Sequence, residues 1–208
     1  MIKIIISTII SWIVKILLGV SARFQSKDME FKSTIFYANH SSHIDTIAIW
    51  SSLPAHIRIK THPIAAKDYW GTSVLKKYLA TQCLNAILIN RKNSNKEENP
   101  FEEIQKTLEK GDNIIIFPEG TRSLDGEIHD FKSGLYYFSQ INPNIKIVPV
   151  YLENFHRSMP KGTFWILPLL CRVKFGKQLL KIAQEDKKEF LARAKEEIIQ
   201  LKNEGKNI

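Results

Sequence analysis

Cysteine is scarce in this chain: its 208 residues include only Cys83 and Cys171. Two cysteines are too few for a fold held together by disulfide bonds, and both thiols are expected to stay reduced. The absence of any CxxC pair also excludes a zinc ribbon and a thioredoxin-type site. Internal repeats, low-complexity tracts and linker-like stretches are absent too, so the length suits one domain with its own hydrophobic core.

Acidic residues are outnumbered, with 21 Asp and Glu against 30 Lys and Arg, which gives a formal net charge of +9. Residues 54–96 contribute +7 of it, through eight basic residues and one acid. Such a block predicts contact with phosphate groups of lipids or of a substrate. Aromatic residues do not alternate with the basic ones as stacking platforms would, and no nucleic-acid-binding motif occurs. We therefore expect no nucleic-acid partner.

Only one long apolar run occurs, over residues 4–20, broken once by Lys15. As a helix it would measure about 25 Å, short of the ~30 Å hydrocarbon core of a bilayer. A signal peptide is disfavoured because no small-x-small cleavage site follows. A spanning helix with Lys3 and Lys15 near its ends stays open, while Trp12 and Lys15 favour a monotopic helix in the interface.

We therefore expect residues 1–24 to anchor the protein at the cytoplasmic face of the cell membrane, as a monotopic or single-helix anchor. Residues 25–208 are expected to form the folded domain. Its oligomeric state does not follow from the sequence.

Beyond residue 30, short β-rich runs alternate with helical patterns. This alternation predicts one α/β domain with a mixed, mostly parallel sheet flanked by helices. The expected strands are residues 35–38, 57–60, 64–66, 86–90, 114–117, 146–151 and 172–176. The expected helices are residues 46–53, 73–81, 100–111 and 133–141, with an amphipathic C-terminal helix over 185–204.

The first segment with chemical character is Asn-His-Ser-Ser-His-Ile-Asp, directly after the strand expected at 35–38. Asp45 can orient His40 and raise its basicity, which is half of a hydrolase triad. A GxSxG nucleophile is missing, so a substrate hydroxyl is the favoured nucleophile. Attack by Ser41 or Ser42 stays as a minor alternative. Metal ligation by His40 and His43 is disfavoured, because the spacing is not that of HExxH.

The second segment is Phe-Pro-Glu-Gly-Thr-Arg-Ser at residues 117–123, which leaves a buried strand and enters a polar turn. Gly120 allows the backbone to approach a ligand closely. Arg122 offers a planar set of donors suited to phosphate.

Taken together and in this order, the segments resemble the glycerolipid acyltransferase family, whose best-known members acylate lysophosphatidic acid. The family block NHxSxxD is matched by residues 39–45, and FPEGTRS is matched without change by residues 117–123. A strand of FIDR type corresponds to Ile-Leu-Ile-Asn-Arg at 87–91, where Asn90 replaces the usual acid. FKxG at 131–134 and VPV at 148–150 follow, so the resemblance covers about residues 33–176.

The resemblance implies an acyltransferase that moves a fatty acyl group from acyl-CoA or acyl carrier protein to lysophosphatidic acid, making phosphatidic acid. It implies neither a metal nor a redox cofactor, and it implies membrane lysolipid and phospholipid as partners. His40 would be the base and Asp45 its orienter. The substrate-binding residues it implies are Lys67, Arg91, Glu119, Gly120, Thr121 and Arg122. Of these, Lys67, Arg91 and Arg122 would hold the phosphate and Glu119 would position the glycerol. Another lysophospholipid or a lyso-aminolipid is the alternative acceptor, and a non-enzymatic basic binder is a remote one.

Overall fold

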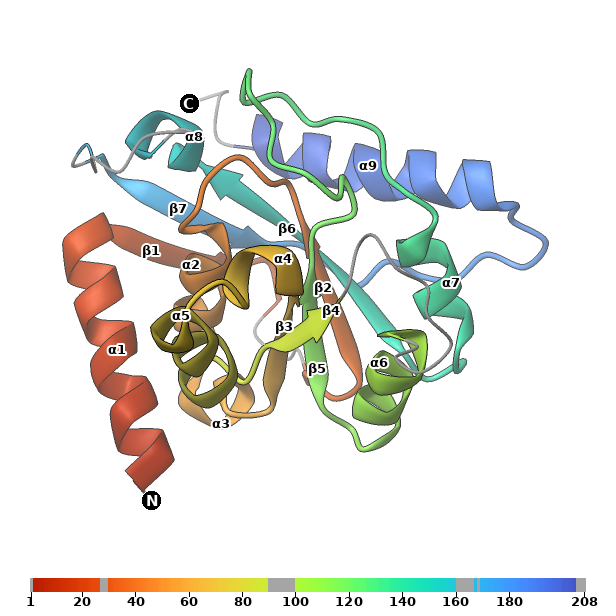
Figure 1. Ribbon diagram of the computed structural model, residues 1–208. Coiled ribbons are helices and arrows are strands. Elements are labelled where there is room, and N and C mark those ends of the chain that lie inside the picture. The colour runs from red at the N-terminus through yellow and green to blue at the C-terminus, as the bar shows by residue number, and fades with distance from the viewer. Residues whose placement is uncertain (1, 27–29, 90–99, 160–166, 168, 205–208) are drawn as a thin grey trace.

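The computed structural model describes residues 2–26, 30–89, 100–159, 167 and 169–204 (Figure 1). Its strands are β1 (Val20–Phe24), β2 (Thr34–Ala38), β3 (Thr61–Ala66), β4 (Ile87–Ile89), β5 (Asn113–Ile116), β6 (Lys146–Glu153) and β7 (Cys171–Phe175). Its α-helices are α1 (Ile2–Leu18), α2 (Asp45–Ser52), α3 (Ala55–Arg58), α4 (Lys67–Trp70), α5 (Val74–Tyr78), α6 (Pro100–Glu109), α7 (Gly134–Gln140), α8 (Phe155–Ser158) and α9 (Lys187–Asn203). A π-helical turn, η1 (Leu79–Cys83), follows α5.

All seven strands form one sheet in the order β1-β7-β6-β2-β5-β3-β4. From β6 to β4 every neighbouring pair is parallel, whereas β7 runs antiparallel to β6 and β1 runs parallel to β7. The predicted α/β class with a mostly parallel sheet is therefore confirmed. Because β2, β3, β4, β5 and β6 share one direction, the segments that follow them emerge at the same edge of the sheet.

Strand β2 lies at the centre and is buried on both faces. Ile35 and Tyr37 belong to the core that also contains residues of α6, α7 and α9, while Phe36 and Ala38 belong to the core that contains residues of α1 and α2. Figure 1 shows where these helices lie around the sheet. Successive side chains of a strand face opposite sides, so an unbroken apolar run is what a strand covered on both faces requires.

The predicted C-terminal amphipathic helix is confirmed as α9, which begins at a capping box. The Asp186 side chain accepts from Glu189 N, and the Glu189 side chain accepts from Asp186 N. The helix buries Phe190, Ala194 and Ile198 against the sheet. These bonds satisfy backbone donors that a helix start otherwise leaves without partners.

Residues 57–60, expected as a strand, fall instead in α3 and the turn after it, so that prediction was wrong. An alternation over only four residues does not distinguish strand from helix. Pro54 precedes α3, and its carbonyl accepts the first backbone bonds, from Ile57 N and Arg58 N. Arg58 is buried and donates to the carbonyls of Ser51 and Leu53 at the end of α2. It therefore does not belong to a phosphate-facing surface.

Residues 20–24 also depart from expectation, since they leave the predicted anchor segment and form β1 in the sheet. Gly19 has φ +55°, a conformation that ends α1 and that glycine adopts easily. Val20 and Phe24 turn inward and β1 pairs with β7. Within the described residues, no helix combines the length and the apolar character needed to cross a bilayer.

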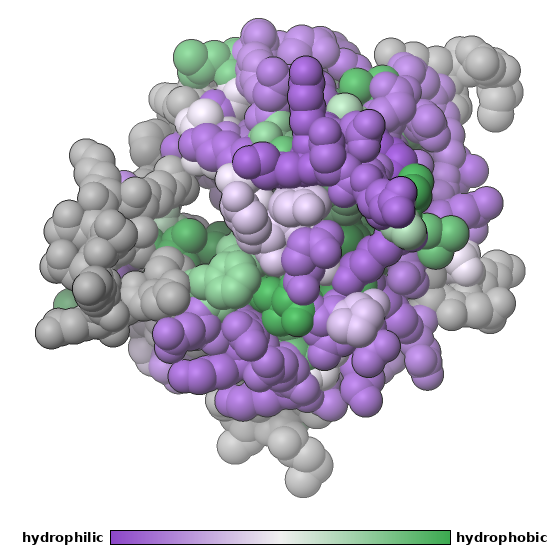
Figure 2. Space-filling view, turned by 90° about the vertical axis from the view of Figure 1, so that its right-hand side faces the viewer, coloured by the Kyte–Doolittle hydropathy of each residue, from purple (hydrophilic) through white to green (hydrophobic). Residues whose placement is uncertain are grey.

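Helix α1 has an inverted pattern of burial. Its inner face includes two serines, Ser7 and Ser11, beside Val14 and Leu18. The Ser11 hydroxyl donates to Ser51 O of α2 at 2.8 Å. The outer face is apolar, with side chains 46% to 72% exposed: Ile5, Ile6, Ile9, Trp12, Ile13, Ile16 and Leu17. On the side of the molecule away from α1, the surface is mostly hydrophilic (Figure 2).

One buried hydrogen bond ties the central strand to α9. The Tyr37 hydroxyl donates to Ala194 O at 3.0 Å, and burial raises the pKa of Tyr37 well above its ordinary value. Tyr37→Phe should lower the free energy of unfolding by about 1–2 kcal/mol, because the bond is lost from a buried site. Urea unfolding measures this. Tyr137→Phe, at a half-exposed ring, is the control and should change little; equal losses in both variants would contradict the prediction.

Candidate active site

The predicted motif residues gather at the carboxyl edge of the parallel strands. His40 follows β2, residues 117–123 follow β5, and Lys67 begins α4 directly after β3. Strands β2 and β5 are neighbours, which brings segments 79 residues apart into contact. Clefts outside the carboxyl ends of parallel strands are the usual ligand sites of open α/β sheets.

Asp45 and His40 meet as expected: His40 Nδ1 lies 2.9 Å from Asp45 Oδ2. The same oxygen accepts from the backbone N–H groups of Ser41 at 2.7 Å and Ser42 at 2.8 Å. Asp45 is fully buried as the first residue of α2, where the helix dipole favours a carboxylate. Since Nδ1 faces the carboxylate, it carries the proton and Nε2 is the basic nitrogen.

Phe117, the residue after β5, holds the other side of the imidazole. Its ring is stacked on that of His40, with centroids 4.0 Å apart and 18° between the planes. The stack and the Asp45 contact together restrict both the position and the rotation of the His40 ring. Nothing in the spacing of the two motifs indicated this contact, which depends on the adjacency of β2 and β5.

Glu119, which the resemblance implied would position the glycerol, is a buried carboxyl bonded to the backbone. Its side chain is 4% exposed, and its two oxygens accept from His40 N at 2.9 Å and from His129 N at 3.3 Å. Burial raises the pKa of this carboxyl. Both oxygens thus bind backbone on either side of the site, so Glu119 positions the His40 main chain.

The turn around Gly120 is shaped by its conformation and by Lys132. Gly120 has φ +72°, and a Cβ placed there would lie 2.7 Å from Lys132 Nζ. The positive φ favours glycine, because other residues rarely adopt this backbone conformation, whereas the end of the flexible Lys132 side chain could move aside. Lys132 belongs to the FKxG block, and the sequence alone does not indicate a role for it. Its ammonium lies over the turn that contains Thr121 and Arg122. The Thr121 side chain is exposed.

Arg122 is brought to the first motif by two contacts. The backbone N–H of the next residue, Ser123, donates to His40 O at 2.7 Å. The Arg122 guanidinium contacts the His43 ring through Nη1 and Nδ1. The structure therefore joins His40, Asp45, Glu119, Gly120 and Arg122 in one site.

Lys67 lies at the same edge of the sheet but two strands away from β2, because β5 intervenes. Neighbouring strands are about 4.8 Å apart, so the backbones of β2 and β3 differ by about 10 Å, within reach of a lysine and a bound phosphate ester. Arg91 and Asn90 lie outside the described residues. No cluster of three or more potential metal-ligating side chains occurs within the described ranges.

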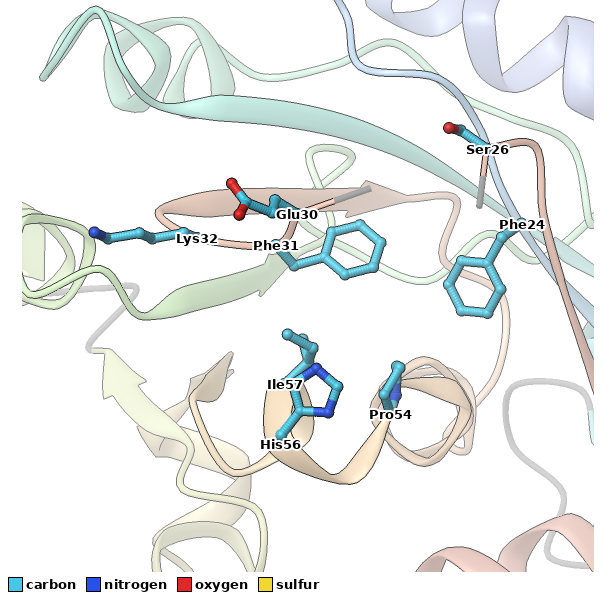
Figure 3. A pocket seen from close by; sticks show the side chains of 8 residues that line it. All are labelled: Phe24, Ser26, Glu30, Phe31, Lys32, Pro54, His56 and Ile57. Atoms are coloured by element: carbon cyan, nitrogen blue, oxygen red, sulfur yellow. The ribbon is translucent and has the colours of Figure 1, made fainter. Parts of the chain in front are cut away.

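A cavity of about 650 Å³ lies away from this site (Figure 3). Phe24 and Phe31 line one side of it and Pro54, His56 and Ile57 the other. Phe31 precedes β2, whereas His40 follows it, so the cavity is at the amino edge of the parallel strands. Its lining contains no residue of the two motifs.

Comparison with known proteins agrees with this geometry. A family model described as acyltransferase matches residues 24–153, well over half of the chain. The chain belongs to the acyltransferase family. A 1-acyl-sn-glycerol-3-phosphate acyltransferase of Limnanthes douglasii is 30% identical over 173 residues, covering 82% of this chain and 57% of the relative. A probable enzyme of the same name from Mycoplasma genitalium is 31% identical over 122 residues, covering 57% of this chain and 43% of the relative.

The chain thus spans little more than half the length of the Limnanthes relative. Among solved structures, the 1-acyl-sn-glycerophosphate acyltransferase of Thermotoga maritima superposes with a TM-score of 0.71. That match covers 95% of this chain and 78% of the other at 20% identity, which shows a shared fold.

Replacing Glu119 tests its positioning role. Glu119→Gln leaves one N–H of the pair facing an amide donor, which should cost about 1–3 kcal/mol of unfolding free energy and lower turnover. The acceptor KM should change less than turnover; a change in acceptor KM alone would indicate direct contact with substrate instead.

The raised pKa of Glu119 also predicts how the free energy of unfolding changes with pH. The folded state binds the proton more tightly than the unfolded state, so this group's contribution to stability falls as pH rises from about 4.3 through the folded pKa. The unfolding free energy of the wild type should therefore decline relative to that of Glu119→Gln over this range. Parallel pH profiles of the two proteins would contradict the assignment.

Proposed function

We propose that this chain transfers a fatty acyl group from a thioester donor to the free hydroxyl of lysophosphatidic acid, with phosphatidic acid as product. The proposal rests on the His40–Asp45 pair, in which Asp45 orients His40 as a general base. Because the sequence contains no GxSxG nucleophile, the acceptor hydroxyl is the group that this base would activate. Arg122, in the facing turn, gives a donor group suited to the acceptor phosphate. The names of the relatives support lysophosphatidic acid as the acceptor.

The reaction follows from the orientation of the imidazole. His40 Nε2 takes the proton of the acceptor hydroxyl as the oxygen attacks the thioester carbonyl, and Asp45 stabilises the imidazolium that forms. The C–O bond forms, the C–S bond then breaks, and the departing thiolate takes the proton back from His40. Either acyl-CoA or acyl carrier protein can supply the thioester. Holding both substrates in this geometry contributes up to about 7–11 kcal/mol of barrier reduction.

His40→Ala should abolish acyl transfer, and Asp45→Asn should lower turnover by about 10²- to 10⁴-fold, because the base is lost or loses its orienting charge. The assay is acyl transfer from acyl-CoA to lysophosphatidic acid in detergent micelles, with other lysolipids run in parallel. A matched control is His62→Ala, which removes another Asp-paired histidine at the amino edge of the sheet. Normal turnover in His40→Ala would refute the mechanism, and a preference for a phosphate-free acceptor would refute the substrate.

We propose in addition that α1 places the protein on a membrane surface, at the cytoplasmic face of the cell membrane. The support is its outer face, where the apolar side chains stand opposite the buried serines. Trp12 and Lys15 on this helix suit the interfacial zone. The basic residues of the block 54–96, other than the buried Arg58, would add attraction to anionic lipid of about 1 kcal/mol for each cation close to the surface.

The surface of α1 can be altered without disturbing its inner face. Replacing Ile9, Trp12 and Ile16 together by serine should lower binding to anionic phospholipid vesicles by about tenfold or more, since each substitution removes exposed apolar area that would be buried in the lipid interface. The matched control is Leu180→Ser with Ile182→Ser, which removes exposed apolar side chains outside α1. Cosedimentation with vesicles is the measurement. Equal retention of both variants would contradict the anchoring role.

A further inference from the structure

The contact between His43 and Arg122 has a consequence for acceptor binding. His43 occupies a position that the NHxSxxD pattern leaves open, and its Nδ1 meets Nη1 of Arg122 from the other motif. We propose that His43 is a positioning residue that holds the Arg122 guanidinium for the acceptor phosphate. This inference rests on the proposed function, because it assigns the affinity for the acceptor to a residue acting through Arg122.

The chemistry of the two groups determines the direction of the bond. A guanidinium has only donors and keeps its proton in proteins. Nδ1 of His43 must therefore accept, so the ring is neutral with its proton on Nε2. A protonated His43 would lose this acceptor and place a second cation beside Arg122. The contact thus specifies one tautomer and one charge state of His43.

The bond between His43 and Arg122 can favour acceptor binding because of where the two residues lie. Arg122 follows a glycine turn whose backbone is fixed to His40 through Ser123 N, but this fixes only the main chain. An arginine side chain loses rotamer freedom when it is ordered. Because His43 orders the guanidinium before the acceptor binds, binding of the acceptor does not have to order it, and the affinity is higher. His43 lies three residues after His40, so the phosphate site and the base share one short segment.

Two substitutions at His43 separate holding Arg122 from merely filling space. His43→Leu removes the acceptor and should raise the KM for lysophosphatidic acid about ten- to hundredfold. Turnover and the KM for acyl-CoA should change much less. His43→Asn presents an amide oxygen near the place of Nδ1 and should restore most of the acceptor affinity. A loss confined to turnover, or equal effects of Leu and Asn, would overturn the proposal.

A double-mutant cycle with Arg122→Ala decides whether His43 acts through the arginine. If it does, His43→Leu should raise the acceptor KM in the wild type but have no further effect in the Arg122→Ala background. Additive effects would overturn the proposal. Failure of the proposed function is distinguishable: the wild type would then not acylate lysophosphatidic acid. Urea unfolding of each variant shows that the kinetic changes occur in folded protein, and a reduced acceptor affinity traced to unfolding would also count against His43.

Discussion

The arrangement of the site depends on a single carboxylate oxygen, Oδ2 of Asp45, which accepts from two backbone N–H groups and faces the ring of His40. The backbone bonds close the turn between β2 and α2, and the ring contact sets the tautomer of the base. Because Asp45 is also the first residue of α2, the buried charge lies at a helix N-terminus, where it is stabilised. The turn, the helix start and the proposed base His40 are thus held together by one carboxylate.

The second motif depends on this unit through the order of the strands. With β2 beside β5, the main chain of His40 donates to Glu119 and accepts from Ser123, so the two turns fix each other. A parallel sheet allows these contacts between the two turns, because the loops that follow adjacent parallel strands lie at the same edge of the sheet. Lys67 reaches that edge from β3, one strand further along.

Sequence reasoning identified the class of fold, the central strands and the joined residues of the site, because apolar runs and motif blocks are local signals. It failed where tertiary context decided the outcome. Residues 57–60 alternate like a strand, but Arg58 turns inward to bind the end of α2. The stack of Phe117 on His40 and the contact of His43 with Arg122 join residues from different motifs, and no spacing within one motif predicts them. The resemblance implied that Glu119 contacts the glycerol of the acceptor, which stays a prediction; its bonds to His40 N and His129 N join separate segments and could not be predicted from the motif alone.

Helix α1 connects the proposed membrane surface to the base through α2. The Ser11 hydroxyl and the Arg58 guanidinium both donate to Ser51 O near the end of α2, and the same helix begins with Asp45. An eight-residue helix is about 12 Å long, so the contacts of α1 and Arg58 with the end of α2 lie about that far from Asp45 at its start. Polar groups on the inner face of α1 thus fix its rotation, which directs the apolar face outward. If that face lies in the interface as proposed, the height of His40 above the lipid is set by α2, and a lysolipid hydroxyl can meet the base at the membrane surface.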